Sequence, residues 1–188
     1  MLKLKIALVT SALALAIASA TIAFAGANLL KNGKFNNTNG WSPFDETTVL
    51  SIEARRLKVE NTDASGTFTN AWASQCVGIT PGAKYRFDVD ALEPLGQPRD
   101  GSAFVDIAYF SEPGCNGSLA GSDTTDAAPA GEWTHFTLNL GAPAGAQSLR
   151  VDLVAAKGPV FEGQPADGTF HALFDNASLK TVGGKPQQ

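Results

Sequence analysis

The chain has 188 residues, of which 44% are hydrophobic and 17% charged, and its formal net charge is −4. This length supports one globular domain with a hydrophobic core and is short for two. The low charge, together with 19 glycines and 10 prolines, argues against a coiled coil, long helical repeats and compositional disorder. The negative balance argues against a nucleic-acid partner, which a basic face normally binds.

The first 25 residues have the organisation of a secretory signal peptide. Lys3 and Lys5 form a positive start, and an apolar run rich in Ala and Leu follows over 6–22. We expect cleavage after Ala25, with Ala20 as an alternative, because small residues precede both positions; a retained membrane anchor is the competing interpretation. No later apolar stretch is long enough to span a bilayer. Cleavage leaves 163 residues with a net charge of −6, which predicts a secreted, extracellular or periplasmic, acidic protein.

The rest of the chain alternates apolar and polar residues with a period of two. The clearest runs cover 85–91, 103–109, 136–140 and 149–153, and clusters of Gly and Pro separate them. No later window holds a convincing helical period over ten or more residues. The pattern predicts eight to ten short strands in an all-β jelly-roll β-sandwich of two antiparallel sheets over 26–181, with a flexible tail over 182–188.

Cys76 and Cys115 are the only cysteines. An oxidising compartment favours a disulfide between them, and the chain-entropy model gives such a loop of about 40 residues roughly 3–4 kcal/mol of stabilisation. A nucleophilic cysteine is the alternative, but neither residue lies in a motif that would activate a thiol.

Five sequence patterns occur in the order found in a known family. They are NLLKNGKFN at 28–36 with GW at 40–41, SQCVGITPGAKY at 74–85, GEWTHF at 131–136, APAGA at 142–146 before a strand, and FDNASL at 174–179. Over nearly all of 28–180 this set resembles the galactose-binding-like jelly rolls of carbohydrate-binding module families 4, 9 and 22. The resemblance implies a non-catalytic, lectin-like module that recognises a poly- or oligosaccharide, although this fold carries many binding functions.

The same resemblance implies a structural calcium ion in many members, near the first and last strands. Its ligands are backbone carbonyls, an acidic side chain after the N-terminal Phe, and the Asp of the closing strand. Asp175 matches the second position, whereas Asn36 stands at the first and Lys34 lies nearby. Calcium binds six to eight oxygens, with an affinity that rises with their charge, so Asn36 weakens the expected site. The alternative for Asp175 is a carboxylate that accepts backbone N–H bonds at a strand end.

Sugar binding needs rings that stack on a pyranose and planar polar groups that bond its hydroxyls. We expect Trp72 and Phe104 to stack, with a buried ring as the alternative for Trp72. Trp41 and Trp133 match positions that usually pack into the sandwich in the family that the chain resembles, so the resemblance implies that both lie in the core. If their strands are neighbours in one sheet, four outward-facing residues would bind hydroxyls: Arg86, Asp88, Asp106 and Arg150. The alternative is a solvated sheet face with cross-strand ion pairs of little energetic weight.

A catalytic role is the less favoured interpretation. Asp88 and Asp90 lie two residues apart on one strand face, which suits a glycosidase acid pair, but any strand with alternating acids has this spacing. His135 and His171 are the only histidines, and no Gly-x-Ser-x-Gly elbow occurs. The alternatives to sugar binding are therefore a structural or protein-interaction β-sandwich and, less favoured, a small carbohydrate-active enzyme.

Overall fold

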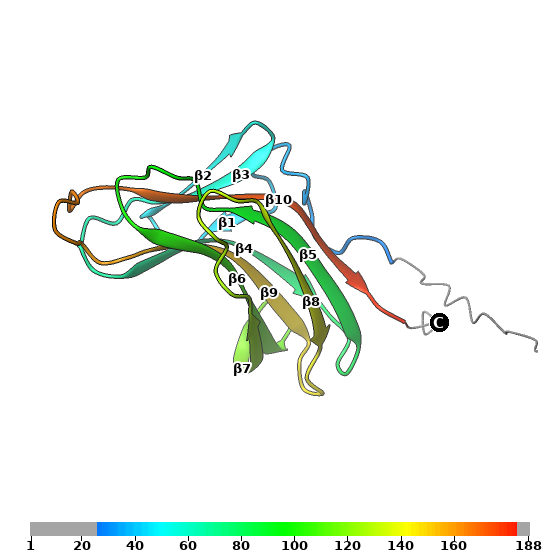
Figure 1. Ribbon diagram of the computed structural model, residues 1–188. Helices are drawn as coiled ribbons and strands as arrows, with labels where there is room; N and C mark the ends of the chain where they lie inside the picture. The colour runs from blue at the N-terminus through cyan, green and yellow to red at the C-terminus, as the bar shows by residue number, and fades with distance from the viewer. Residues whose placement is uncertain (1–25, 184–188) are drawn as a thin grey trace, which may run out of the picture.

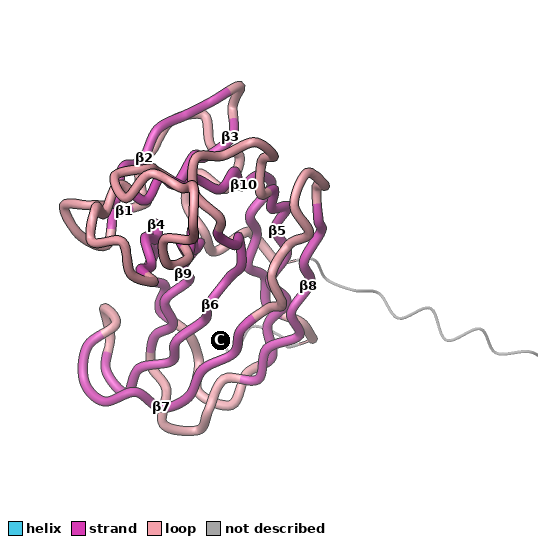
Figure 2. The backbone as a smooth tube through the Cα atoms, turned by 60° about the vertical axis from the view of Figure 1, so that its left-hand side comes forward, coloured by secondary structure: helices cyan, strands magenta, loops and turns pink. Residues whose placement is uncertain are grey.

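The computed structural model describes residues 26–183, which form ten β-strands and no helix (Figures 1 and 2). The predicted signal peptide and residues 184–188 of the predicted tail lie outside the described residues. Within the described part there is accordingly no helix long and apolar enough to cross a membrane.

The strands form two five-stranded sheets that stack face to face, and all paired strands are antiparallel (Figure 1). We name each sheet after its central strand. The β9 sheet has the order β1 (Ser42–Pro43), β4 (Thr69–Gly78), β9 (Ser148–Lys157), β6 (Gly101–Glu112) and β7 (Asn116–Thr124). The β10 sheet has the order β2 (Thr48–Glu53), β3 (Arg56–Asn61), β10 (Phe170–Thr181), β5 (Lys84–Leu92) and β8 (Thr134–Gly141). The predicted all-β sandwich is confirmed.

Alternation along the strands builds the core between the sheets. In β5, Tyr85, Phe87 and Val89 are buried, while Arg86 and the two aspartates of this strand point away from the core. Successive residues of a strand face opposite sides of the sheet, so each such strand supplies one apolar face to the core and one polar face to the surface.

β9 departs from this alternation, because nine of its ten residues are buried. Its end reads Leu153-Val154-Ala155-Ala156, a continuous apolar run of the kind found where both faces of a strand are covered. Asp152 points away from the core, as expected, but it is buried and not solvated. The centre of this outer face is therefore shielded from water.

The predicted disulfide is present and joins two parts of the β9 sheet. Cys76 lies in β4, and Cys115 lies in the turn between β6 and β7, with 5.9 Å between their Cα atoms. β9 lies between β4 and β6, and the Cys115 N–H donates to Ser148 Oγ of β9 at 2.9 Å. The disulfide therefore ties the β6–β7 hairpin back across β9 to β4.

Candidate functional site

Rows of cross-strand neighbours organise the outer face of the β9 sheet. Trp72, Val154 and Phe104 lie directly opposite one another on β4, β9 and β6, and the next row holds Ser74, Asp152 and Asp106. Directly paired residues share a sheet face and lie within side-chain reach. The register thus places two aromatic rings beside a row of hydroxyl and carboxylate groups.

The aromatic row includes a ring that the sequence did not reveal. Phe44 follows the two-residue strand β1 and stacks on Trp72, with 3.6 Å between ring centroids. Phe44 is 52% exposed, whereas Val154 between Trp72 and Phe104 is 1% exposed. One face of the Trp72 ring is therefore covered by Phe44, and the buried indole Nε1 has no hydrogen-bond partner among residues 26–183. A two-residue strand has too few residues to show a period, so no sequence signal marked Phe44.

The polar row centres on the carboxylate of Asp152. Ser74 Oγ donates to Asp152 Oδ1 at 2.6 Å, and Arg150 Nε donates to Oδ2 at 2.8 Å. Burial raises the pKa of Asp152, and the nearby charge of Asp106 raises it further, against the effects of Ser74 and Arg150. Removal of a carboxylate from water disfavours its charged form. The Asp152 carboxylate is therefore a held, desolvated acceptor beside the rings.

Arg86 and Asp88 lie on a different surface from the other predicted sugar ligands. Both belong to β5, which is part of the β10 sheet, so the condition that all these strands be neighbours in one sheet is not met. Trp72, Phe104, Asp106 and Arg150 share the outer face of the β9 sheet, and Arg86 and Asp88 lie on the opposite outer face of the sandwich.

Arg86 and Asp88 hold one another. Arg86 Nε lies 2.9 and 3.0 Å from the two Asp88 oxygens, and Thr137 Oγ1 donates to Asp88 at 2.8 Å. Burial acts to raise the pKa of Asp88, but the hydrogen bonds from Arg86 and Thr137 outweigh it, so this pKa lies below its ordinary value. A glycosidase acid requires the opposite shift. These contacts match the alternative of a sheet face with ion pairs.

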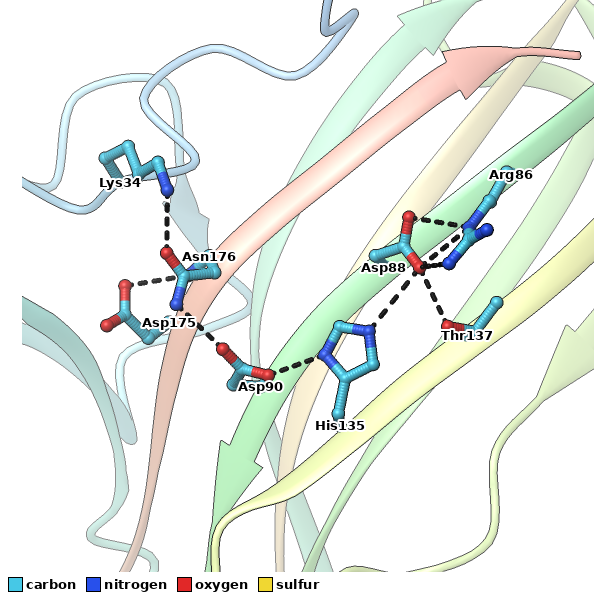
Figure 3. Close-up of polar contacts among 8 residues, drawn as sticks. All are labelled: Lys34, Arg86, Asp88, Asp90, His135, Thr137, Asp175 and Asn176. Carbon is cyan, nitrogen blue, oxygen red and sulfur yellow. Dashed lines mark hydrogen bonds and ion pairs between the residues drawn. The ribbon is translucent and has the colours of Figure 1, made fainter. Parts of the chain in front are cut away.

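A chain of polar contacts extends from this pair toward Lys34 in the N-terminal segment, which is residues 26–41 before β1 (Figure 3). His135 Nδ1 lies 2.6 Å from Asp90 Oδ1, and Asn176 Nδ2 donates to Asp90 Oδ2 at 2.7 Å. Lys34 Nζ in turn donates to Asn176 Oδ1 at 2.8 Å. Both carboxylates of the alternative catalytic pair, Asp88 and Asp90, are therefore engaged by neighbouring side chains of the same surface.

The two predicted calcium ligands lie at the end of this chain. Asn36 Oδ1 accepts a bond from Arg55 Nη2 at 3.5 Å, and Asp175 Oδ1 accepts the backbone N–H of Asn176 at 2.7 Å. Nowhere in residues 26–183 do three or more His, Cys, Asp or Glu side chains gather as a metal site. One carboxylate beside the cations of Lys34 and Arg55 is a weaker ligand set than calcium prefers, because calcium affinity rises with the charge of its oxygen ligands. Calcium binding by Asn36 and Asp175 stays a prediction.

The two tryptophans expected in the core have different environments. Trp41 is buried and packs against Phe35, with 5.6 Å between ring centroids, as predicted. The expectation for Trp133 is wrong: it is 41% exposed, and the Arg56 guanidinium lies 4.9 Å from its ring centroid. Trp133 comes two residues before the outward-facing His135 and shares its parity, so its ring belongs to the outer face of the β10 sheet.

Comparison with known proteins rests on structure, since no protein-family model and no curated protein matches this chain. The enzymatically active domain of bacteriophage CBA120 tailspike protein 4 aligns with a TM-score of 0.59 and 13% identity, over 82% of this chain and 21% of that chain. The CBM22-1 and GH10 modules of Clostridium thermocellum xylanase 10B align with a TM-score of 0.55 and 18% identity, over 81% and 28%.

An isolated module gives a match over nearly its whole length. The C-terminal family 22 carbohydrate-binding module of Clostridium thermocellum xylanase 10B aligns with a TM-score of 0.54 and 21% identity, over 83% of this chain and 98% of that chain. This chain thus spans less than a third of the two longer chains and almost all of the isolated module. At these identities the likeness concerns the fold alone: the chain has the jelly-roll β-sandwich of carbohydrate-binding modules.

Proposed function

We propose that this protein is a secreted, non-catalytic carbohydrate-binding module that holds a poly- or oligosaccharide on the outer face of the β9 sheet. The observation that carries the proposal is the placement of the aromatic row, Trp72 and Phe104 with Phe44 stacked at its end, beside Asp152 and Asp106. A pyranose presents an apolar face and a rim of hydroxyls, and these two rows offer a partner to each.

Each side chain has a distinct part in the proposed complex. The exposed ring of Phe44 and the partly buried ring of Phe104 would stack on sugar rings. Asp106 lies directly opposite Asp152 and would accept bonds from a pair of hydroxyls. Arg150 orients Asp152, because its Nε is committed to that carboxylate and its guanidinium lies 5.6 Å from the Phe110 ring.

A non-catalytic and extracellular role agrees with the chemistry of the other residues. The acid pair that a glycosidase would need is engaged in ion pairs and amide contacts, and the pKa of Asp88 is lowered, which disfavours a general acid. The disulfide between Cys76 and Cys115 suits an oxidising compartment.

Affinity electrophoresis of the protein without residues 1–25 tests the proposal. Gels would contain a soluble β-glucan, a xylan or a mannan, and we expect retardation in at least one of them. Phe104→Ala and Phe44→Ala should each weaken retardation about tenfold or more, because a stacked ring carries a large part of the affinity of such sites.

The matched control is Trp133→Ala, which removes an exposed ring from the opposite outer face. This variant should migrate as the unchanged protein does. Unretarded migration of the unchanged protein in every gel contradicts sugar binding. Loss of retardation in Trp133→Ala but not in Phe104→Ala contradicts the proposed location, because sugar would then bind the outer face of the β10 sheet and not that of the β9 sheet.

A further inference from the structure

The N-terminal segment crosses the irregular part of β10 beside the β2–β3 turn and leaves two adjoining hollows there. They have volumes of about 490 and 520 Å³ and share Lys34, Asn36 and Asn176 in their linings. The register of β10 on β5 shifts between Asp175 and Ser178, which displaces Asn176 from the regular ladder. We call the pair of hollows the Lys34 hollow. Figure 3 shows Lys34 reaching across to Asn176 on β10.

The lining of the Lys34 hollow is positively charged, although the whole chain is acidic. Four cationic side chains line it, and Asp175 is the one carboxylate among its lining residues; the cations are Lys34, Arg55, Arg56 and Lys180. One oxygen of Asp175 already accepts the Asn176 N–H, and the bond from Arg55 to Asn36 is long at 3.5 Å. Several amide side chains complete the wall, which therefore combines excess positive charge with neutral hydrogen-bonding groups.

Backbone strain is concentrated at the same place. Within residues 26–183, six residues other than glycine have a positive φ, and five of them line or flank the Lys34 hollow: Asn32, Phe35, Ala54, Arg55 and Asn176. Asn tolerates this conformation, but for Phe, Ala and Arg it costs on the order of 1 kcal/mol each. Ala54 and Arg55 are the two central residues of the β2–β3 hairpin, where the common two-residue turn requires a positive φ at both positions, so the turn accounts for their conformation.

We propose that the Lys34 hollow binds an oxyanion carried on a ring-sized molecule, namely an acidic sugar residue such as a uronic acid. Arginine recognises carboxylates with paired hydrogen bonds, and lysine adds a point charge. The two hollows are open to solvent, and their volumes of about 490 and 520 Å³ leave room for more than a bare ion. The amides of Asn36 and Asn176 would meet the hydroxyls.

This site is separate from the proposed sugar-stacking face and reverses the expectation of a cation there. The N-terminal segment packs on β10, since the Ala177 N–H donates to the Gly33 carbonyl at 2.9 Å, and β10 is the centre of the opposite sheet. A cation would lie beside Lys34 and Arg55, whereas an anion would neutralise them.

Amide chemical-shift titration of the isotope-labelled protein tests the proposal. Sodium glucuronate, glucose, sodium sulfate and calcium chloride would each be added at one matched ionic strength. We expect saturable shifts with glucuronate, confined to residues 32–36, 54–56 and 175–180, and none with glucose.

Arg55→Gln should weaken glucuronate binding about tenfold, since it removes one charge-assisted contact and keeps a long polar side chain. Lys180→Gln is a second variant from the other side of the hollow. Lys84→Met, an exposed lysine at the start of β5, is the control and should bind glucuronate unchanged.

Each remaining outcome overturns the proposal. Equal affinity for sulfate rejects the ring-sized ligand, saturable shifts with calcium chloride in place of glucuronate reject the anion, and equal effects of Arg55→Gln and Lys84→Met reject the location. Phe104→Ala should leave this titration unchanged, so a failure of the proposed polysaccharide binding is distinguishable from a failure here.

Discussion

At the scale of single residues, the buried aspartate in the middle of a sheet's outer face needs an explanation. A hydrophobic residue at position 152 would extend the apolar end of β9, yet a carboxylate is present there with Ser74 and Arg150 bonded to it and Asp106 directly opposite. Like charges opposite one another in a sheet are destabilising. A position that costs stability and faces outward is one that function accounts for better than folding does.

We predict that Asp106→Asn lowers the pKa of Asp152, because it removes the neighbouring negative charge that helps to raise it. A carbon-detected NMR titration of the side-chain carboxyl groups measures this directly. Glu53→Gln, which makes the same change on the outer face of the other sheet, is the control and should leave the Asp152 pKa where it was. An unchanged pKa in Asp106→Asn contradicts the coupling.

The sign of the matching stability change follows from proton linkage. With a raised pKa, folded Asp152 keeps its proton at a pH where the unfolded chain has lost it, so its contribution to the free energy of unfolding falls as the pH rises from the unfolded value through the folded one. In Asp106→Asn the interval between the unfolded and folded pKa values of Asp152 is narrower, because the folded pKa is less raised. Urea unfolding should therefore show that the free energy of unfolding of Asp106→Asn increases relative to that of the unchanged protein as the pH rises through this range.

At the scale of elements, the contact between the N-terminal segment and β10 depends on one glycine. A Cβ atom on Gly33 would lie 1.9 Å from the backbone oxygen of Ala177, and the Asn28 side chain bonds the same oxygen at 3.1 Å. The segment also bonds β10 through the Leu29 N–H and the Leu179 carbonyl at 2.8 Å. Close backbone approach, and no special φ, requires glycine here.

Gly33→Ala should destabilise the protein by about 1–3 kcal/mol, the usual cost of forcing extra volume into a packed site. It should also abolish the glucuronate shifts, since the Lys34 hollow is built on this contact. Gly145→Ala is the matched control, because a Cβ there meets nothing within 4 Å. Chemical denaturation measures both variants, and equal midpoints contradict the predicted clash.

At the scale of the whole molecule, the sandwich presents two outer faces of different chemistry. The β9 sheet carries the aromatic row and the buried carboxylate, and the β10 sheet carries the ion pairs and leads to the Lys34 hollow. Two faces that point in opposite directions do not share one ligand. The disulfide acts at this scale too, because it restricts the unfolded chain between residues 76 and 115.

Replacement of both cysteines by serine should lower the free energy of unfolding by about 3–4 kcal/mol, as expected for the loop that the disulfide closes. Urea unfolding with and without a reducing agent measures the change. The unchanged protein should lose stability on reduction, whereas the Cys76→Ser, Cys115→Ser variant should not respond, and a response by the variant would contradict this account.

Local patterns in the sequence are enough to predict much of this fold. The alternation in β5 follows from strand parity, the disulfide from the presence of only two cysteines in a chain expected to be exported, and the burial of Trp41 from the family resemblance. Parity also explains why the expectation of a buried Trp133 was wrong. Trp133 lies two residues before His135 and points outward with it, although its ring is apolar.

The partners of each strand were decided only by the tertiary structure. β5 and β6 are consecutive in the chain but lie in different sheets, which separates Arg86 and Asp88 from Phe104, Asp106 and Arg150. The burial of Asp152 and the stacking of Phe44 on Trp72 likewise depend on strands far apart in sequence. The two-residue period of the sequence indicates which side of a strand is apolar. Hydrogen bonds between segments distant in sequence determine which strands lie side by side.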